Sequence, residues 1–225
     1  MELEIDVMDY LQYNSKLILT FFFISLLALA LNYITHDKIN TLLFSTYRSS
    51  PFNIFTYVRL VGHIIGHSSW SHFSSNFIYI LLIGPMLEEK FGTENLFLMI
   101  LITAIVVGII NSFRKNVRLE GASSIVFMFI TLSSFVNIQE GKIPLTLVLI
   151  CLFHVADEFI DLGKKDGVSH LGHILGAICG CIFRFFVCGR TNTIMEITSK
   201  LYYASDIKLT FFLDFYAQMT YNKLC

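Results

Sequence analysis

The sequence predicts an all-α membrane protein whose helices cross the bilayer several times. Hydrophobic residues make up 55% of its 225 residues and charged residues only 15%, whereas soluble domains carry about 25% charge. The mean hydropathy is +0.65. Uncharged apolar segments recur along the chain, several near the roughly 17–25 residues that a membrane-crossing helix needs. With 22 phenylalanines and only three prolines, the chain is also not disordered.

The composition excludes several other classes. The net charge is −1, so the chain lacks the concentrated basic surface of a nucleic-acid-binding protein. None of the five cysteines forms a CxxC pair, and four lie in or beside apolar segments. Neither a disulfide framework nor a thiolate zinc site is indicated. We expect no nucleic-acid partner, no bound metal and no cofactor.

Six apolar segments are the candidate spans. Residues 1–16 form a short acidic N-terminal segment without the basic start of a cleaved secretory signal. The later segments are short and contain Ser, Gly or His, which suits interior helices whose protein neighbours satisfy polar groups. The predicted spans are Leu17–Ile34, His72–Leu87, Leu96–Ile110, Ala122–Val136, Ile143–Ala156 and Leu171–Cys188.

The connections carry further expectations. The long segment 35–71 should have structure of its own, because long loops in compact bundles are usually structured and functional. The charged stretch EEKFGTEN should form the turn after the second span. In the C-terminal tail 189–225, Leu209–Met219 is too short to span and is typical of an interfacial helix. The membrane domain is therefore 17–188. Lys and Arg divide eight to eight between the two sides, so their distribution predicts no orientation.

Three polar clusters begin the even-numbered spans: HSSWSHFSSN, EGASS and SHLGHILGAICG. Alternate spans of a serial bundle enter the membrane from the same face, so all three clusters should lie at a similar depth. Polar groups inside spans are functional candidates. The spacing therefore predicts one layer that contains His72, Asn76, Ser123 and His173.

These residue types suit nucleophilic catalysis. A serine hydroxyl needs a base, usually histidine. Ser123 follows Gly121 at a helix start, where free N–H groups favour developing negative charge. His72 and Asn76 lie four residues apart, on one helix face, and two neutral donors suit an oxyanion hole.

Close helix packing is predicted for the sixth span. Gly176 and Gly180 form a GxxxG pattern, which lets two helices approach. A Ser–His hydrogen bond of about 2.6–3.2 Å between helices requires such an approach. Each feature alone is more often a packing feature, and only their shared face makes them informative together.

These motifs resemble those of the rhomboid family of intramembrane serine proteases. GASS resembles the family's GxSG motif, HFSSN its HxxxN motif and HILGAICG its HxxGxxxG motif. The flanking runs VRLVGHIIGHSSWSHFSSN and GPMLEEKFGT are also similar. The resemblance covers about 53–186, with the motifs in the family's order.

The resemblance implies a Ser–His dyad in a six-helix rhomboid-like bundle. Ser123 would be the nucleophile and His173 the general base. His72, Asn76 and the Ser123 backbone N–H would hold the oxyanion, and His67 would be structural. The implied activity is cleavage of transmembrane segments of single-pass proteins in the lipid bilayer. The implied location is the plasma membrane, with a cytosolic N-terminus and a half-embedded first loop.

The sequence departs from the family at three positions. Ser124 replaces the last glycine of GxSG, and its hydroxyl could bond back to its own helix. Gly172 replaces the usual alanine, and His170 offers a competing register for the histidine motif. These changes concern rate and specificity more than the dyad.

Two other functions compete with proteolysis. A rhomboid-like pseudoprotease would bind membrane helices without cutting them, although Ser123 and His173 are both present. A metal or proton transporter could use His63 with His67, or His170 with His173, at helical spacing. No HExxH motif is present, which disfavours a membrane metalloprotease.

Overall fold

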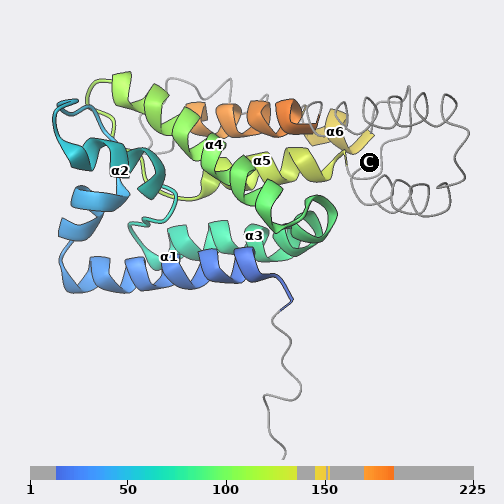
Figure 1. Ribbon diagram of the computed structural model, residues 1–225, viewed down its shortest axis with the longest axis horizontal. Coiled ribbons are helices and arrows are strands. Elements are labelled where there is room, and N and C mark those ends of the chain that lie inside the picture. The colour runs from blue at the N-terminus through green and yellow to red at the C-terminus, as the bar shows by residue number, and fades with distance from the viewer. Residues whose placement is uncertain (1–13, 136–144, 151, 153–169, 185–225) are drawn as a thin grey trace, which may run out of the picture.

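The computed structural model describes residues 14–135, 145–150, 152 and 170–184, and these residues fold as helices and loops (Figure 1). Within them, β pairing is confined to one bridge between Thr46 and Leu119. The all-α prediction is therefore confirmed for the described chain. The helices are α1 (Lys16–Ile34), the π-helix η2 (Asn40–Phe44), α2 (Ile54–Gly62), α3 (Trp70–Phe91), α4 (Thr93–Phe113), α5 (Ser123–Ser133), α6 (Leu145–Ile150) and a last helix, His170–Arg184.

The observed end of helix α3 differs from the sequence expectation. The stretch EEKF continues α3 to Phe91 instead of forming a turn, and α4 begins at Thr93. Gly92 alone makes the turn, with φ +81, a left-handed conformation that favours glycine. At the other end of α3, the Ser69 side chain accepts a hydrogen bond from the His72 N–H at 3.2 Å and caps the helix. Local capping thus sets both ends of the helix.

The helices pack as a bundle around one apolar core. Helix α3 packs against α1 and α5, while α4 packs against α2 and α5. Phenylalanines on α3 and α5 fill the interior: Phe73, Phe77 and Phe129 are each at most 1% exposed. Helices α3, α5 and His170–Arg184 all start at the end of the bundle where α2 lies, whereas α1 and α4 end there (Figure 1). The three polar clusters therefore meet at one end of the bundle.

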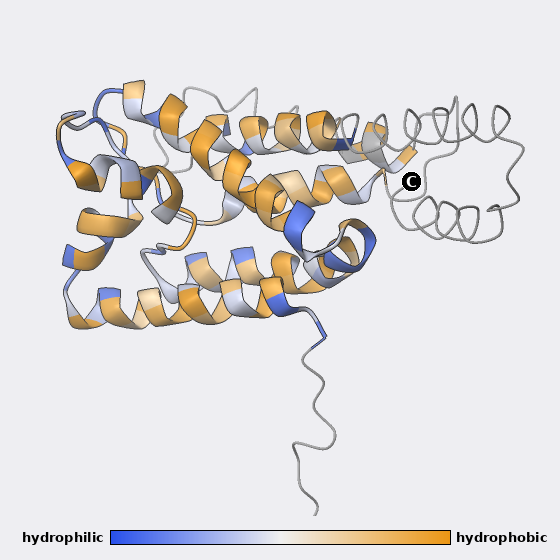
Figure 2. Ribbon diagram, viewed as in Figure 1, coloured by the Kyte–Doolittle hydropathy of each residue, from blue (hydrophilic) through white to orange (hydrophobic). Residues whose placement is uncertain are grey.

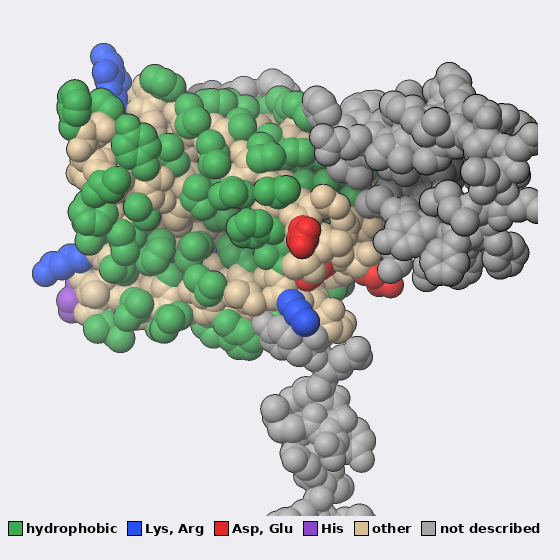
Figure 3. All heavy atoms as spheres, in the orientation of Figure 1, with side chains coloured by type: hydrophobic (Ala, Val, Ile, Leu, Met, Phe, Trp, Pro, Cys, Tyr) green, Lys and Arg blue, Asp and Glu red, His purple; other side chains and the backbone are tan. Residues whose placement is uncertain are grey.

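The helix surfaces suit a lipid environment. Two helices are long and apolar enough to cross a membrane, Lys16–Ile34 and Thr93–Phe113, with mean hydropathies of 2.3 and 2.6. Two shorter apolar helices, Ser123–Ser133 and His170–Arg184, lie beside them. Apolar residues cover the helices along their length (Figure 2). On the visible face, hydrophobic side chains cover the body of the bundle and charged side chains gather at its two ends (Figure 3).

The six-span prediction reaches beyond the described residues. The predicted fifth span is described only over α6, and the sixth only over His170–Arg184. The N-terminal segment up to residue 13 and the tail 189–225, with its predicted interfacial helix, lie outside the described residues. The count of six spans therefore stays a prediction.

The first loop has the structure of its own that its length predicts. It contains η2 and α2, and Arg59 of α2 is buried beneath the loop. The Arg59 Nη2 donates to Ser49 Oγ at 2.8 Å, and its guanidinium lies 4.5 Å from the centre of the Tyr47 ring. The backbone of α2 contacts α4 at Gly108, where a Cβ would lie 2.4 Å from the Leu60 carbonyl oxygen. This packing holds the loop against the bundle.

Candidate active site

The start of α5 carries Ser123, and the turn before it packs against the ring of His72. Ser123 is the first residue of α5 and is half-buried. Two residues earlier, Gly121 has φ +113, which side chains rarely adopt. A Cβ at Gly121 would lie 2.5 Å from His72 Nε2, so glycine is needed for the backbone to pass the imidazole. The GASS stretch is thus a tight turn pressed onto α3.

His72 and Asn76 lie on the same face of α3, as predicted. Asn76 is 6% exposed, and its Nδ2 would be 3.5 Å from a Cβ at Gly121. The His72 Nδ1 lies 3.3 Å from Ser68 Oγ, while its Nε2 faces Gly121. Both predicted donor groups therefore border the turn that leads into Ser123.

His67 connects these two elements. Its Nδ1 lies 3.0 Å from the Ile65 carbonyl oxygen, which can only accept. Its Nε2 therefore accepts, from Asn76 Nδ2 at 3.2 Å and from the Ala122 N–H at 3.4 Å. Burial, and secondarily the nearby His72, lower the pKa of His67 to about 3. A neutral His67 thus orients the Asn76 amide and the turn before Ser123, a role that spacing alone did not indicate.

His173 lies on the last helix and packs against α5. Its side chain is 8% exposed, and its ring stacks on Phe127 with centroids 4.4 Å apart and planes 7° apart. Phe127 lies one helical turn after Ser123. The imidazole is therefore on the side of α5 that carries Ser123. The three motifs quoted above do not include Phe127, and its four-residue spacing from Ser123 was the available signal.

The two glycines of the last helix contact α5. A Cβ at Gly176 would lie 2.1 Å from the Ser124 carbonyl oxygen, and one at Gly180 would lie 2.7 Å from the Met128 carbonyl oxygen. The two helices therefore run in the same direction at close range. In this register His173 lies level with Gly121, two residues before Ser123. The contacts therefore bring His173 to the start of α5, where Ser123 lies.

The same glycines distinguish the two possible histidine registers. A motif that began at His170 would require its glycines at His173 and Ala177. The glycines that contact α5 are Gly176 and Gly180, which belong to the register that begins at His173. The rings of His170 and His173 lie 6.4 Å apart, centre to centre. His170 lies at the first residue of the helix.

The Ser124 hydroxyl does not bond back to its own helix, which the sequence had suggested it could do. Its side chain is buried at 3% exposure, and its Oγ has no hydrogen-bond partner among the described residues. The backbone of Ser124 instead forms the surface on which Gly176 packs. The hydroxyl is therefore accommodated by packing, at the energetic cost of an unpaired polar atom.

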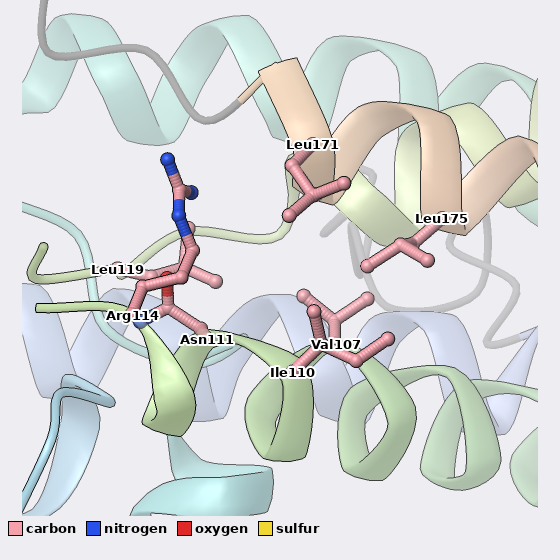
Figure 4. A pocket seen from close by; sticks show the side chains of 8 residues that line it. Val107, Ile110, Asn111, Arg114, Leu119, Leu171 and Leu175 are labelled. Atoms are coloured by element: carbon pink, nitrogen blue, oxygen red, sulfur yellow. The ribbon is translucent and has the colours of Figure 1, made fainter. Parts of the chain in front are cut away.

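A narrow apolar crevice separates α4 from the last helix near this layer (Figure 4). Leu171 and Leu175 face Val107 and Ile110 across it, and Arg114 rises at its edge. Asn111, at its base, donates through Nδ2 to the Thr46 carbonyl oxygen at 3.0 Å. Apart from Asn111 and Arg114, the side chains that line the crevice are aliphatic.

One histidine of the transporter hypothesis, His63, supports the turn before Ser123. In the part of the chain that is described, His, Cys, Asp and Glu nowhere gather in the groups of three or more that a metal ion needs. His63, which was paired with His67 at helical spacing, is fully buried at the end of α2. Its backbone carbonyl accepts a hydrogen bond from the Gly121 N–H at 2.8 Å. His63 thus contributes through its main chain to the turn formed by the GASS stretch. We call this stretch, residues 121–124, the nucleophile turn because it carries Ser123.

The fold and the site together define a class: a helical membrane protein with a buried layer of serine, histidine and amide groups at one end. Residues 55–190 match the family model for the rhomboid domain. The match covers more than half of the chain, so the protein belongs to the rhomboid family. Members of this family are integral membrane proteins, and the family includes proteases.

Two relatives show how far the similarity extends. The chain is 24% identical over 132 residues to rhomboid-like protein 11, chloroplastic, of Arabidopsis thaliana, covering 52% of this chain and 47% of the relative. It is 24% identical over 136 residues to the rhomboid protease GlpG of Haemophilus influenzae, covering 56% of this chain and 68% of the relative. The chain thus spans about half the length of the plant relative. The similarity supports protease activity at the level of the family.

Proposed function

We propose that this protein is an intramembrane serine endopeptidase that cleaves transmembrane segments of single-pass membrane proteins. The observation that carries the proposal is the layer in which Ser123 heads α5, His173 stacks one turn away on Phe127, and His72 and Asn76 border the preceding turn. Nucleophile, base and donors then approach one scissile peptide from three helices.

The reaction follows from the roles of these groups. His173 takes the proton from Ser123 Oγ as the oxygen attacks the scissile carbonyl carbon. The oxyanion of the tetrahedral intermediate accepts hydrogen bonds from the Ser123 N–H, His72 Nε2 and Asn76 Nδ2. His173 then protonates the leaving amine, and an acyl-enzyme remains. Water, activated by His173, hydrolyses this ester and regenerates the serine.

The neighbours of the donors leave them available for this role. Asn76 Nδ2 carries two hydrogens, and His67 Nε2 accepts one of them. The second hydrogen can point toward the oxyanion. When Ser68 Oγ donates to His72 Nδ1, the imidazole carries its proton on Nε2, which faces the nucleophile turn. Both donors are thus held by other groups before substrate binds.

The proposed topology completes the bundle with six spans over 17–188. The first loop then lies half in the membrane interface, since Phe52, Ile54 and Tyr57 are 98%, 69% and 56% exposed beside apolar helices. Aromatic and aliphatic side chains in such positions favour the interfacial region. The N-terminus is proposed to be cytosolic, with the site toward the opposite face of the plasma membrane.

The dyad is tested with a single-pass reporter reconstituted in liposomes. Ser123→Ala and His173→Ala are each expected to abolish cleavage while keeping the melting temperature. Ser133→Ala, which removes another α5 hydroxyl far from the site, is the matched control and should cleave normally. Cleavage above about one per cent of wild type in either folded dyad mutant would contradict the assignment.

The donors are tested by the same assay and by fluorophosphonate labelling. Removal of one oxyanion donor typically lowers the rate by about 10²–10³. His72→Ala and Asn76→Ala should therefore cleave slowly yet still label weakly at Ser123. An unchanged rate in either mutant would show that the donor assignment is wrong. Wild-type protein that binds the reporter but neither labels nor cuts would instead be a pseudoprotease.

A further inference from the structure

A carboxylate lies directly before the nucleophile turn. Glu120 precedes Gly121, whose backbone touches the His72 ring, and the Glu120 side chain is only 13% exposed. Its Oε2 accepts hydrogen bonds from Ser45 Oγ at 2.5 Å and from Asn40 Nδ2 at 3.4 Å. Glu120 is also close enough to His72 to interact with it electrostatically. The site therefore carries a partly buried negative charge beside the proposed oxyanion hole.

Arg118 is the counter-charge of this carboxylate. Its Nη2 lies 2.8 Å from Glu120 Oε2, and its Nε donates to Ser45 Oγ at 3.0 Å. The same guanidinium binds Asp37, with Nη1 2.6 Å from Oδ2 and Nη2 2.8 Å from Oδ1. Hydrogen bonding to Arg118 lowers the pKa of the half-exposed Asp37 carboxyl. One arginine thus bridges the first loop and the nucleophile turn.

This arrangement matters because the reaction develops negative charge nearby. An unpaired carboxylate beside the oxyanion opposes that charge, and Coulomb repulsion grows as the effective dielectric constant falls from water toward the partly buried site. A guanidinium within hydrogen-bond distance of Glu120 reduces this repulsion, although Arg118 is shared with Asp37. The pairing is therefore expected to act on the transition state more than on the folded state.

The ion pair does not hold the loop alone. Thr46 and Leu119 exchange two backbone hydrogen bonds of 2.8 and 2.9 Å between the first loop and the turn. The Gly121 N–H adds a third main-chain bond, to the His63 carbonyl oxygen. These bonds keep the turn docked when a side chain is changed. If a variant of Arg118 or Glu120 loses activity, the loss can then be attributed to the change of charge, because the backbone hydrogen bonds remain.

We propose that Arg118 is a positioning residue that counters the charge of Glu120, the carboxylate next to the oxyanion hole of the protease. The inference rests on the proposed proteolytic function of Ser123 and deepens it. It assigns a purpose to a pair of side chains that none of the rhomboid motifs contains.

Four variants separate charge compensation from tethering: Arg118→Gln, Glu120→Gln, their double mutant and Arg118→Lys. Reporter cleavage in neutral liposomes gives kcat and KM for each, and thermal melting checks folding. Compensation predicts that Arg118→Gln lowers kcat about 10-fold with little change in KM. Glu120→Gln should stay within about 3-fold of wild type, and the double mutant should recover most of the loss. Arg118→Lys keeps the charge and should keep kcat.

The control variant removes the exposed partner of the same arginine. Asp37→Asn should leave kcat within about 2-fold of wild type, because Glu120 keeps its counter-charge. If Glu120→Gln and the double mutant are as slow as Arg118→Gln, the pair is only a tether and the inference is wrong. Equal kcat in Arg118→Gln and wild type would also overturn it. A wild-type protein that neither labels with fluorophosphonate nor cleaves would overturn the proposed function, and this inference with it.

Discussion

At the scale of single residues, the proposed catalytic groups are held in place by neighbouring side chains. His67 receives one hydrogen bond from Asn76 and another from the Ala122 N–H, so one imidazole orients both a proposed oxyanion donor and the nucleophile turn. Phe127 holds the His173 ring by stacking. The reacting groups themselves are few, and their geometry is set by neighbours that lie one helical turn or one loop away.

Ser124→Gly is the residue-scale prediction. The buried Ser124 hydroxyl has no partner among the described residues, and an unpaired polar group costs about 1–3 kcal/mol. Glycine in a helix costs about 0.5–1 kcal/mol relative to alanine, so the two effects oppose each other in stability. With less bulk beside the nucleophile, kcat/KM should rise, most for substrates with bulky residues near the cut.

The measurement compares kcat/KM on a small-residue and a bulky-residue reporter. Ser124→Ala is the matched control, because it removes the hydroxyl but keeps the Cβ. Equal values for wild type and Ser124→Gly on both reporters would show that this serine has no kinetic consequence. A loss of activity in Ser124→Gly but not in Ser124→Ala would point to the backbone freedom of glycine as the cause.

At the scale of the elements, packing between the last helix and α5 brings the helices of the proposed base and nucleophile together. We expect Gly176→Ala to lower both the melting temperature and kcat, because the new Cβ would lie 2.1 Å from the Ser124 carbonyl oxygen. Overpacking of this kind typically costs about 1–3 kcal/mol. Ile178→Leu, at a position 47% exposed on the same helix, is the control and should change neither. Unchanged melting and activity in Gly176→Ala would show that the two helices pack less closely.

The start of α1 is joined to the end of α3 by one buried carboxylate. Glu88 is 7% exposed. Its oxygens accept hydrogen bonds from the Leu17 and Ile18 N–H groups at 3.0 and 3.2 Å. They also accept from Ser15 Oγ at 2.5 Å and Thr93 Oγ1 at 2.9 Å. One side chain thus caps the N-terminus of α1 and fixes the α3–α4 turn.

We predict that Glu88→Gln destabilises the bundle by about 2–4 kcal/mol, because the amide has one acceptor oxygen and brings an NH₂ group against N–H donors. Thermal or denaturant unfolding in detergent measures the change. Glu89→Gln, the exposed neighbour, is the control and should have no effect. A Glu88→Gln protein as stable as wild type would mean that water satisfies the α1 donors equally well.

At the scale of the whole molecule, two buried histidines of the first loop are expected to make stability depend on pH. Burial lowers the pKa of His63 to about 4 and that of His67 to about 3. In the unfolded chain a histidine has a pKa near 6.5. Between these values the unfolded state binds more protons than the folded state. Stability is therefore full above about pH 6.5 and falls as the pH drops toward 4.

The expected slope is at most about 1.4 kcal/mol per pH unit for each histidine. Melting temperatures between pH 7 and pH 4.5 measure it. His63→Leu should flatten the curve, because one of the two groups no longer titrates, whereas Ile64→Val, at a buried neighbour without a titratable group, should leave the slope unchanged. A wild-type melting temperature that is constant over this range would contradict the buried, neutral state of both rings.

Much of the site could be predicted from local sequence. The helix periodicity of polar residues indicated that His72 and Asn76 share a face, and the GASS and HILGAICG stretches indicated where helices begin and pack. These predictions succeed because they depend on spacings of three or four residues, which helix geometry converts directly into position. The extent of α3 was missed, since charged residues can continue a helix whose buried carboxylate is satisfied by a distant partner, here the start of α1.

The sequence by itself determined the class of the protein: apolar helices, three polar clusters at helix starts and the residue types of a serine–histidine site. Only the tertiary structure decided which side chains support that site. Arg118 meets Asp37 across 81 residues of sequence, and His67 meets the Ala122 N–H across 55. No local pattern encodes such contacts, because they form when separate helices and loops pack, and packing depends on the shape and polarity of the whole assembled interior.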